Sequence, residues 1–100
     1  MLPDISIEKQ MDHIDQNAFS ITDNPVMHNA LEVLSILQKT RKITISGQGD
    51  LCPNTVAVAN IITENLLTGH SKTEKITVDG KISSDGYMVP MIKITIVKID

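Results

Sequence analysis

The stretch "KITISGQGDLCPNTVAVANII", residues 42–62, contains the change of pattern that decides the fold. Ile43 and Ile45 alternate with polar residues, which indicates a strand with one buried face. A glycine-containing turn follows, and apolar residues then recur at helical spacing from Pro53 to about Leu67. The stretch therefore predicts a strand, a tight turn and a helix in direct succession.

The residues before this stretch predict a second strand and helix. Phe19 and Ile21 alternate with polar residues and indicate a short strand. Asn24 is a good N-cap residue and Pro25 suits the first helical position, so a helix is expected from there to about Lys39. Its predicted apolar stripe consists of Val26, Met27, Ala30, Leu31, Val33, Leu34 and Leu37. Its predicted outward side holds His28, Asn29, Glu32 and Ser35.

The residues after it predict a long hairpin. "EKITVDGKI" (74–82) and "MVPMIKITIVKI" (88–99) are strand-like and are joined through an Asp-Gly turn signal. Within the last strand, Ile94 and its apolar neighbours share one face, while Lys93 and Thr95 share the other. The whole order predicts an α/β two-layer sandwich, β-α-β-α-β-β, with a four-stranded mixed sheet and both helices on one face. Residues 1–17 are expected to form a mobile tail, and residues 18–100 the domain.

Composition narrows the classes of function. The chain has 100 residues, enough for one hydrophobic core, with 41% hydrophobic and 2% aromatic residues. One cysteine permits no internal disulfide, and neither a leader nor a bilayer-spanning run is evident, so a cytoplasmic protein without a membrane partner is expected. A formal net charge of -3 argues against avid, unspecific binding of polyanions.

The turn at residues 47–54 allows two chemical readings, both disfavoured. A phosphate cradle would lack the Gly-Lys-Ser/Thr ending and the third glycine of the dinucleotide fingerprint, and Asp50 would repel the anion. A reactive Cys52 at the helix start would need a base, and none of the three histidines is spaced to supply it. A free cysteine is more often a small buried apolar residue. The three histidines also offer no i, i+4 pair, so no metal site is predicted. No cofactor, catalytic residue or small-molecule substrate is predicted either.

Three segments together carry a family resemblance: "NPVMHNALEVLSIL", "KITISGQGDLCPNTVAVANII" and "MIKITIVKI". They resemble the Alba family of archaeal chromatin and RNA-binding proteins, whose wider superfamily includes small protein subunits of ribonucleases P and MRP. The likeness covers about residues 18 to 99. It implies a fold similar to the C-terminal domain of translation initiation factor three. It also implies a homodimer or heterodimer that lays a basic surface and two hairpin arms on DNA or RNA.

The resemblance places unusual residues on the expected binding surface. Asp23 and Asn24 stand where the family typically has two lysines. Gln48 and Asp50 replace arginines on either side of the matching Gly49, and Asn54 replaces a lysine. About five positive charges are thus lost, and most of the salt-sensitive affinity should be lost with them.

The sequence therefore predicts a nucleic-acid-binding protein of the Alba type, weaker than its basic relatives, dimeric and nucleoid-associated if archaeal. The predicted binding residues are Asn24, His28, Gln48, Gly49, Asn54 and Lys81. The remaining positive charge forms two expected groups, one of Lys39, Arg41 and Lys42 and the other of Lys72, Lys75 and Lys81. Tyr87 is expected to stack on a base or to pack at the root of the hairpin. The alternative function is an acidic protein-interaction module, or the heterodimer partner of a more basic relative, that has lost direct binding.

Overall fold

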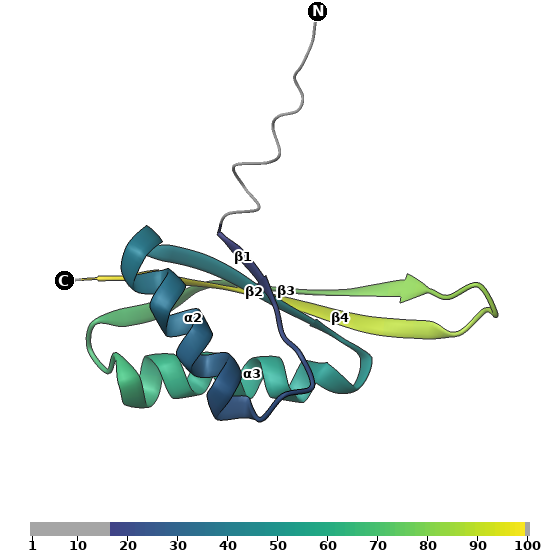
Figure 1. Ribbon diagram of the computed structural model, residues 1–100. Coiled ribbons are helices and arrows are strands. Elements are labelled where there is room, and N and C mark those ends of the chain that lie inside the picture. The colour runs from purple at the N-terminus through teal and green to yellow at the C-terminus, as the bar shows by residue number, and fades with distance from the viewer. Residues whose placement is uncertain (1–16, 100) are drawn as a thin grey trace, which may run out of the picture.

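The computed structural model describes residues 17–99, which form a sheet with both helices on one of its faces (Figure 1). The elements are β1 (Ala18–Ser20), α2 (Val26–Thr40), β2 (Lys42–Gln48), the 3-10 turn η2 (Gly49–Leu51), α3 (Cys52–Ile61), the π turn η3 (Ile62–Leu66), β3 (Ser71–Ile82) and β4 (Met88–Lys98). The predicted fold class and element order are confirmed. Of the predicted tail, residues 1–16 lie outside the described part.

The sheet is mixed and has the strand order β1-β2-β4-β3. β1 runs parallel to β2, whereas β4 is antiparallel to both of its neighbours. Ile45 lies opposite both Phe19 and Ile94, so the apolar residues of three strands share the face that the helices cover. Within residues 17–99, no helix lies on the other face (Figure 1).

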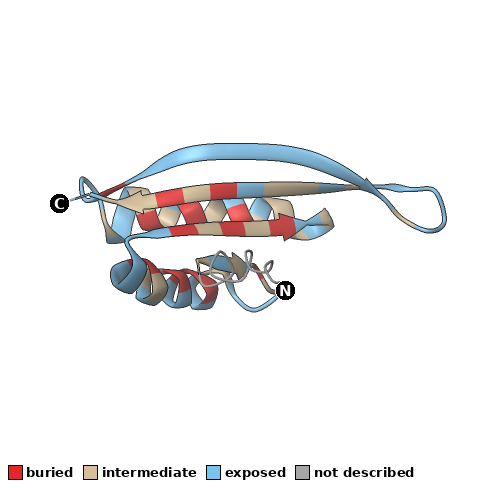
Figure 2. Ribbon diagram, turned by 90° about the horizontal axis from the view of Figure 1, so that it is seen from above, coloured by how far each residue is buried: buried red, intermediate tan, exposed pale blue. Residues whose placement is uncertain are grey.

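The core lies between the helices and the middle of the sheet, and Figure 2 shows the buried residues there. It is aliphatic and consists of Ile21, Ala30, Val33, Leu37, Ile43, Ile45, Val58, Ala59, Ile62, Ile94 and Ile96. Burial of each large side chain is worth about 1.5–3 kcal/mol, so these residues supply most of the driving force for folding. Phe19 packs against this cluster from its edge.

α2 differs in three respects from the sequence prediction. Its N-cap position is Pro25 and carries no side-chain cap, so Asn24 does not cap the helix. Met27 and Leu31 are 50% and 53% exposed, so the buried stripe is narrower than predicted. Asn29, predicted to face outward, is fully buried.

The Asn29 side chain holds the β1–α2 connection against the helix. Its Oδ1 accepts hydrogen bonds from the backbone N–H and the hydroxyl of Thr22, at 3.3 and 3.0 Å. Its Nδ2 donates to the carbonyls of Thr22 and Asn24, at 3.1 and 3.3 Å. These bonds satisfy the amide fully within the core, which is why a polar residue is stable there.

At the turn between β2 and α3, the backbone at the end of the strand lies very close to the backbone at the start of the helix. Gly47 is buried on the helix-covered face of β2. A Cβ at Gly47 would collide with Thr55 Oγ1 and lie 2.8 Å from the carbonyl oxygen of Leu51. Thr55 is itself fully buried and donates to that carbonyl at 2.7 Å. Only glycine therefore lets the start of α3 lie this near to the sheet.

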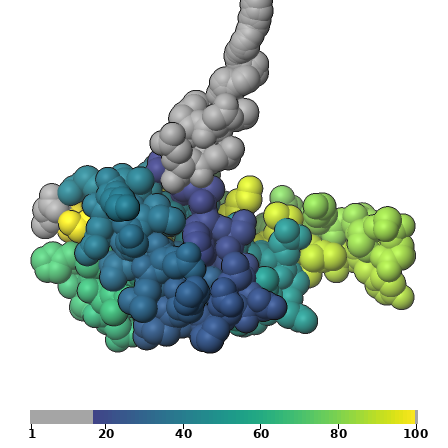
Figure 3. Space-filling model, in the orientation of Figure 1, coloured from purple at the N-terminus to yellow at the C-terminus, as the bar shows by residue number. Residues whose placement is uncertain are grey.

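β3 and β4 extend beyond the helices as an arm, which projects from the body in Figures 1 and 3. Gly86, with φ of 89°, lies in the turn that connects them. Tyr87 is 71% exposed beside this turn, so the expectation that it packs at the hairpin root is wrong. Within residues 17–99, no helix has the length and apolar character needed to cross a membrane.

Replacing Asn29 by alanine should lower the free energy of unfolding by about 2 kcal/mol, because four part-buried hydrogen bonds to the 22–24 segment are lost. For a domain of this size the loss corresponds to a fall of about 8–16 °C in Tm. Thermal unfolding followed by circular dichroism measures it. Asn60→Ala, at an exposed position of α3, is the matched control and should leave Tm unchanged or slightly higher. An equal fall in Tm for the two variants would contradict the role assigned to Asn29.

Gly47→Ala should also destabilise the fold, by about 1–3 kcal/mol or more, because backbone atoms of the turn must move to admit the Cβ. Gly80→Ala is the control, since a Cβ there meets only the flexible side chain of Met88. Urea unfolding of both variants gives the comparison. A midpoint for Gly47→Ala equal to that of the unsubstituted protein would refute the close approach.

Candidate nucleic-acid interface

The connections after β1 and β2 lie at one edge of the sheet, because parallel strands end on the same side. We call residues 21–25 and 48–54 the loop edge. The Ile21 N–H donates to the Ser46 carbonyl at 2.8 Å and joins the first connection to the end of β2. A pocket of about 110 Å³ lies between them, lined in part by Ser20, Gln48 and Met91.

Three of the six predicted binding residues lie close together where the arm begins. Gln48 is exposed and pairs with Met91 of β4. Gly49 follows with φ of 56°, and a Cβ on it would be 3.9 Å from Val89 Cγ1. Val89 in turn lies opposite Lys81. The fold thus brings Lys81, distant in sequence, beside the turn.

The other three predicted residues lie on or beside the helix starts. Asn24 is exposed, and its backbone N–H donates to Thr22 Oγ1 at 3.2 Å. His28 lies near the start of α2, and its Nε2 is 3.0 Å from a carboxylate oxygen of Glu32. The acid therefore lies beside the imidazole that would contact a phosphate. Asn54 is half-buried in the first turn of α3.

The electrostatics of the loop edge are unfavourable to phosphate. Asp23 and Asp50 are both exposed there. Lys81 is the only one of the six predicted residues with a permanent positive charge. The remaining groups are amides, which can form hydrogen bonds to phosphates or bases but attract them only weakly at a distance.

Cys52 contacts two backbone carbonyls. It is half-buried, and its thiol lies 3.7 Å from the Gly47 carbonyl oxygen and 3.6 Å from that of Pro90. Neither partner is a base that could activate the thiol. Across residues 17–99, no three or more His, Cys, Asp or Glu residues gather as a metal site would require.

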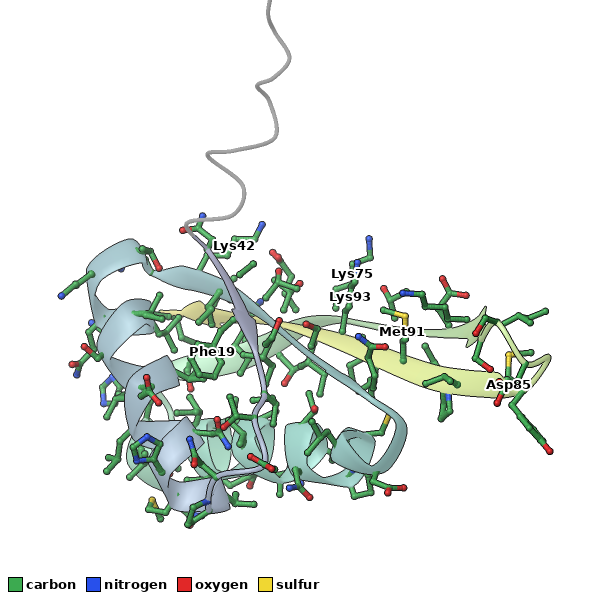
Figure 4. The ribbon with its side chains drawn as sticks, turned by 45° about the vertical axis from the view of Figure 1, so that its right-hand side comes forward. Phe19, Lys42, Lys75, Asp85, Met91 and Lys93 are labelled. Carbon is green, nitrogen blue, oxygen red and sulfur yellow. The ribbon has the colours of Figure 1, made fainter. Side chains whose placement is uncertain are left out.

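The sequence prediction missed one group of positively charged side chains. The helix-free face of the sheet carries Lys42, Lys72, Lys75 and Lys93, which we call the lysine face. Figure 4 shows three of them, Lys42, Lys75 and Lys93, on the side away from the helices. The prediction divided the first three among two other clusters and left Lys93 out. The alternation of Lys93 with buried isoleucines was the signal that could have found it.

Comparison with known proteins agrees with the predicted resemblance. The Alba family model matches residues 17–79. No curated protein shows significant sequence similarity to the chain. Among solved structures, Alba from Thermoplasma volcanium is similar with a TM-score of 0.72 and 26% identity, over 81% of this chain and 99% of that one. ALBA1 from Trypanosoma brucei shares the fold with a TM-score of 0.71 and 17% identity, over 85% of this chain and 71% of that one.

The element order, the arm and the family match therefore lead to one conclusion. The chain belongs to the Alba family, whose members generally bind nucleic acids and often form dimers.

Proposed function

We propose that this protein binds DNA or RNA as a dimer, with lower affinity than relatives that have a basic loop edge. The observation that carries the proposal is the match to the Alba family over residues 17–79. Alba proteins are generally binding proteins and not enzymes, and the surroundings of Cys52 agree with that character here. We further propose a cytoplasmic location, at the nucleoid if the source is archaeal.

The charge of the domain supports this proposal better than the charge of the whole chain does. Residues 17–99 contain eight basic and seven acidic residues. The acidic excess of the chain comes from residues 1–16 and Asp100. The domain itself is therefore close to neutral, and a phosphate near it is influenced mainly by how its charges are distributed.

In this proposal the loop edge and the arm make polar contacts to the nucleic acid. Asn24, Gln48 and Asn54 supply amides that donate to phosphates or to base edges. Lys81 supplies a charge where the arm begins. Tyr87, 71% exposed near the tip of the arm, offers a ring on which a base can stack.

Dimerisation is supported by an apolar surface that runs along β3 and onto the arm. Ile76, Val78, Ile82 and Met88 are 59%, 73%, 69% and 65% exposed, and we call them the apolar arm face. They continue the side of the sheet that the helices cover elsewhere, because Ile76 lies opposite the buried Ile94. A two-stranded ribbon is marginally stable by itself, and exposed apolar patches commonly mark interfaces. A second Alba subunit is the partner that we propose for this face.

The acids of the loop edge favour one second candidate function. Asp23 and Asp50 occupy positions where basic residues would attract phosphate, and both side chains are exposed. A protein with this edge could instead pair with a more basic Alba relative, because opposite charges favour mixed pairing. In that case the relative would supply most of the contacts to nucleic acid.

Fluorescence anisotropy with labelled single-stranded RNA and duplex DNA tests nucleic-acid binding. At low salt we expect dissociation constants on the order of micromolar, which weaken with a shallow salt dependence because few phosphates are neutralised. Asp50→Arg should raise the affinity and steepen log K against log[salt] by about 0.9 for duplex DNA. Glu64→Arg, which makes the same charge change on η3, should have a smaller effect. Absence of binding at low salt, alone and with a basic relative, would overturn the proposal.

Sedimentation equilibrium tests the dimer. The unsubstituted protein should show twice the mass of one chain. Ile76→Glu should lower the measured mass toward that of the monomer, because a buried unpaired charge is costly in an apolar interface. Leu31→Glu is the matched control, since Leu31 is similarly exposed, at 53%, but lies on α2. A dimer that survives Ile76→Glu as well as Leu31→Glu would show that the apolar arm face is not the interface.

A further inference from the structure

The register of β4 with its two neighbours determines which side chains share the helix-free face. Val97 lies between Lys42 of β2 and Lys72 of β3, and directly paired residues point to the same side of a sheet. Thr95 lies opposite Lys75, and Lys93 lies opposite Thr77. The even-numbered Ile94 and Ile96 are buried beneath the helices, so the odd-numbered residues of β4 point the other way. All four lysines of the lysine face are exposed.

The spacing of these lysines is too wide for one small anion. Lys42 and Lys72 are separated by two strand spacings, about 10 Å. Lys75 and Lys93 are diagonal neighbours, whose residues lie about 7–8 Å apart. From the Val97 row to the Lys93 row the strand rises about 14 Å. A ligand that engages the whole face must therefore carry several anionic groups.

The charge of this face is little compensated. Lys42 lies 3.3 Å from Glu74, the extra residue of the β3 bulge between Thr73 and Lys75. Among residues 17–99, Lys72, Lys75 and Lys93 form no ion pair. With Glu74 counted, the four lysines leave a net charge of about three, and Asp79 and Lys81, which continue the same side of β3, offset each other. Four further acids lie on the helices and loop edge. The lysines repel one another until an anionic partner binds.

The side chains around the lysines are short and polar. Ser20, Thr44, Ser46, Thr77 and Thr95 share this face. Thr44 and Thr95 hydroxyls lie 3.0 Å apart and hydrogen-bond to each other. Such side chains leave the lysines accessible and can themselves donate to phosphate oxygens. The two aromatic residues of the chain lie elsewhere, Phe19 against the core and Tyr87 on the arm, so base stacking is not available on this face.

We infer that the lysine face binds the sugar–phosphate backbone of a nucleic acid, without reading its sequence. The inference rests on the proposed nucleic-acid function and assigns most of the electrostatic attraction to a surface other than the loop edge. Several phosphates in a row match the spread of the lysines, and the hydroxyls between them match phosphate oxygens. The loop edge and arm then orient the strand through hydrogen bonds.

The test uses the full chain with Lys75→Gln, Lys93→Gln and the double substitution. Labelled uridine-tract RNA and duplex DNA are titrated over a range of salt concentrations by fluorescence anisotropy. Each glutamine should lower the slope of log K against log[salt] by about 0.7 for the single strand and about 0.9 for the duplex. At about 0.1 M salt that corresponds to about five- to eightfold weaker binding per lysine. Comparison of the two probes shows which nucleic acid supplies the backbone.

Lys39→Gln, in the last turn of α2, is the control with the same change in net charge. It should alter the slope much less than Lys93→Gln. If the unsubstituted protein binds and the double variant retains its slope, the inference is overturned while the proposed function stands. If the unsubstituted protein binds neither probe at low salt, both are overturned. If polyglutamate of equal charge competes as well as RNA does, the face recognises acidic protein and the nucleic-acid assignment is overturned.

Thermal unfolding separates lost binding from lost structure. All three variants should melt within a few degrees of the unsubstituted protein, because the substituted side chains are exposed and form no ion pair with residues 17–99. A double variant that melts normally and binds weakly supports the inference.

Discussion

The antiparallel register of β4 between β2 and β3 is the constraint on which the rest of the structure depends. It sets Ile94 and Ile96 against the helices and Lys93 on the opposite face. A slip by one residue would bring the lysine into the core and turn both isoleucines to solvent. Burial of an unpaired charge costs far more than any gain elsewhere on the sheet, so the register is strongly determined. The same interaction that builds the core therefore fixes where the lysines lie.

The close approach at Gly47 determines what the helices leave uncovered. α3 starts against the end of β2 and packs against β2 and β4, while α2 packs against α3 and the same two strands. Most of β3 then has no helix against it, and all its residues after Ser71 are exposed. An edge strand of this length with apolar side chains on one face needs a partner to protect it. The geometry of one glycine turn thus leads to the surface on which dimerisation is proposed.

The sequence predicted those parts of the fold that depend on local periodicity. Strand order along the chain, the start of α2 and the hairpin all follow from alternation, helical spacing or turn residues. The burial of Asn29 was missed because its side chain is polar, although Asn29 lies one turn before Val33 and two turns before Leu37 on the buried side of the helix. Its burial depends on the 22–24 segment folding back over α2. Met27 and Leu31 were predicted as part of the stripe because they are apolar, but about half of each residue is exposed within the described residues 17–99.

Charge shows most clearly why the candidate site was harder to predict than the fold. The net charge of the chain is an average over surfaces that do not act together on one ligand. At physiological ionic strength a fixed charge acts over about 8 Å, so a phosphate on one face of the sheet is little affected by acids beyond the helices. Asp23 and Asp50 make the loop edge less attractive to phosphate, while Lys72, Lys75 and Lys93 make the helix-free face of the sheet more attractive. On the proposal made above, an Alba domain that lacks basic residues in its loops would attract nucleic acid through lysines that share one face, and the β4 register places four of them there.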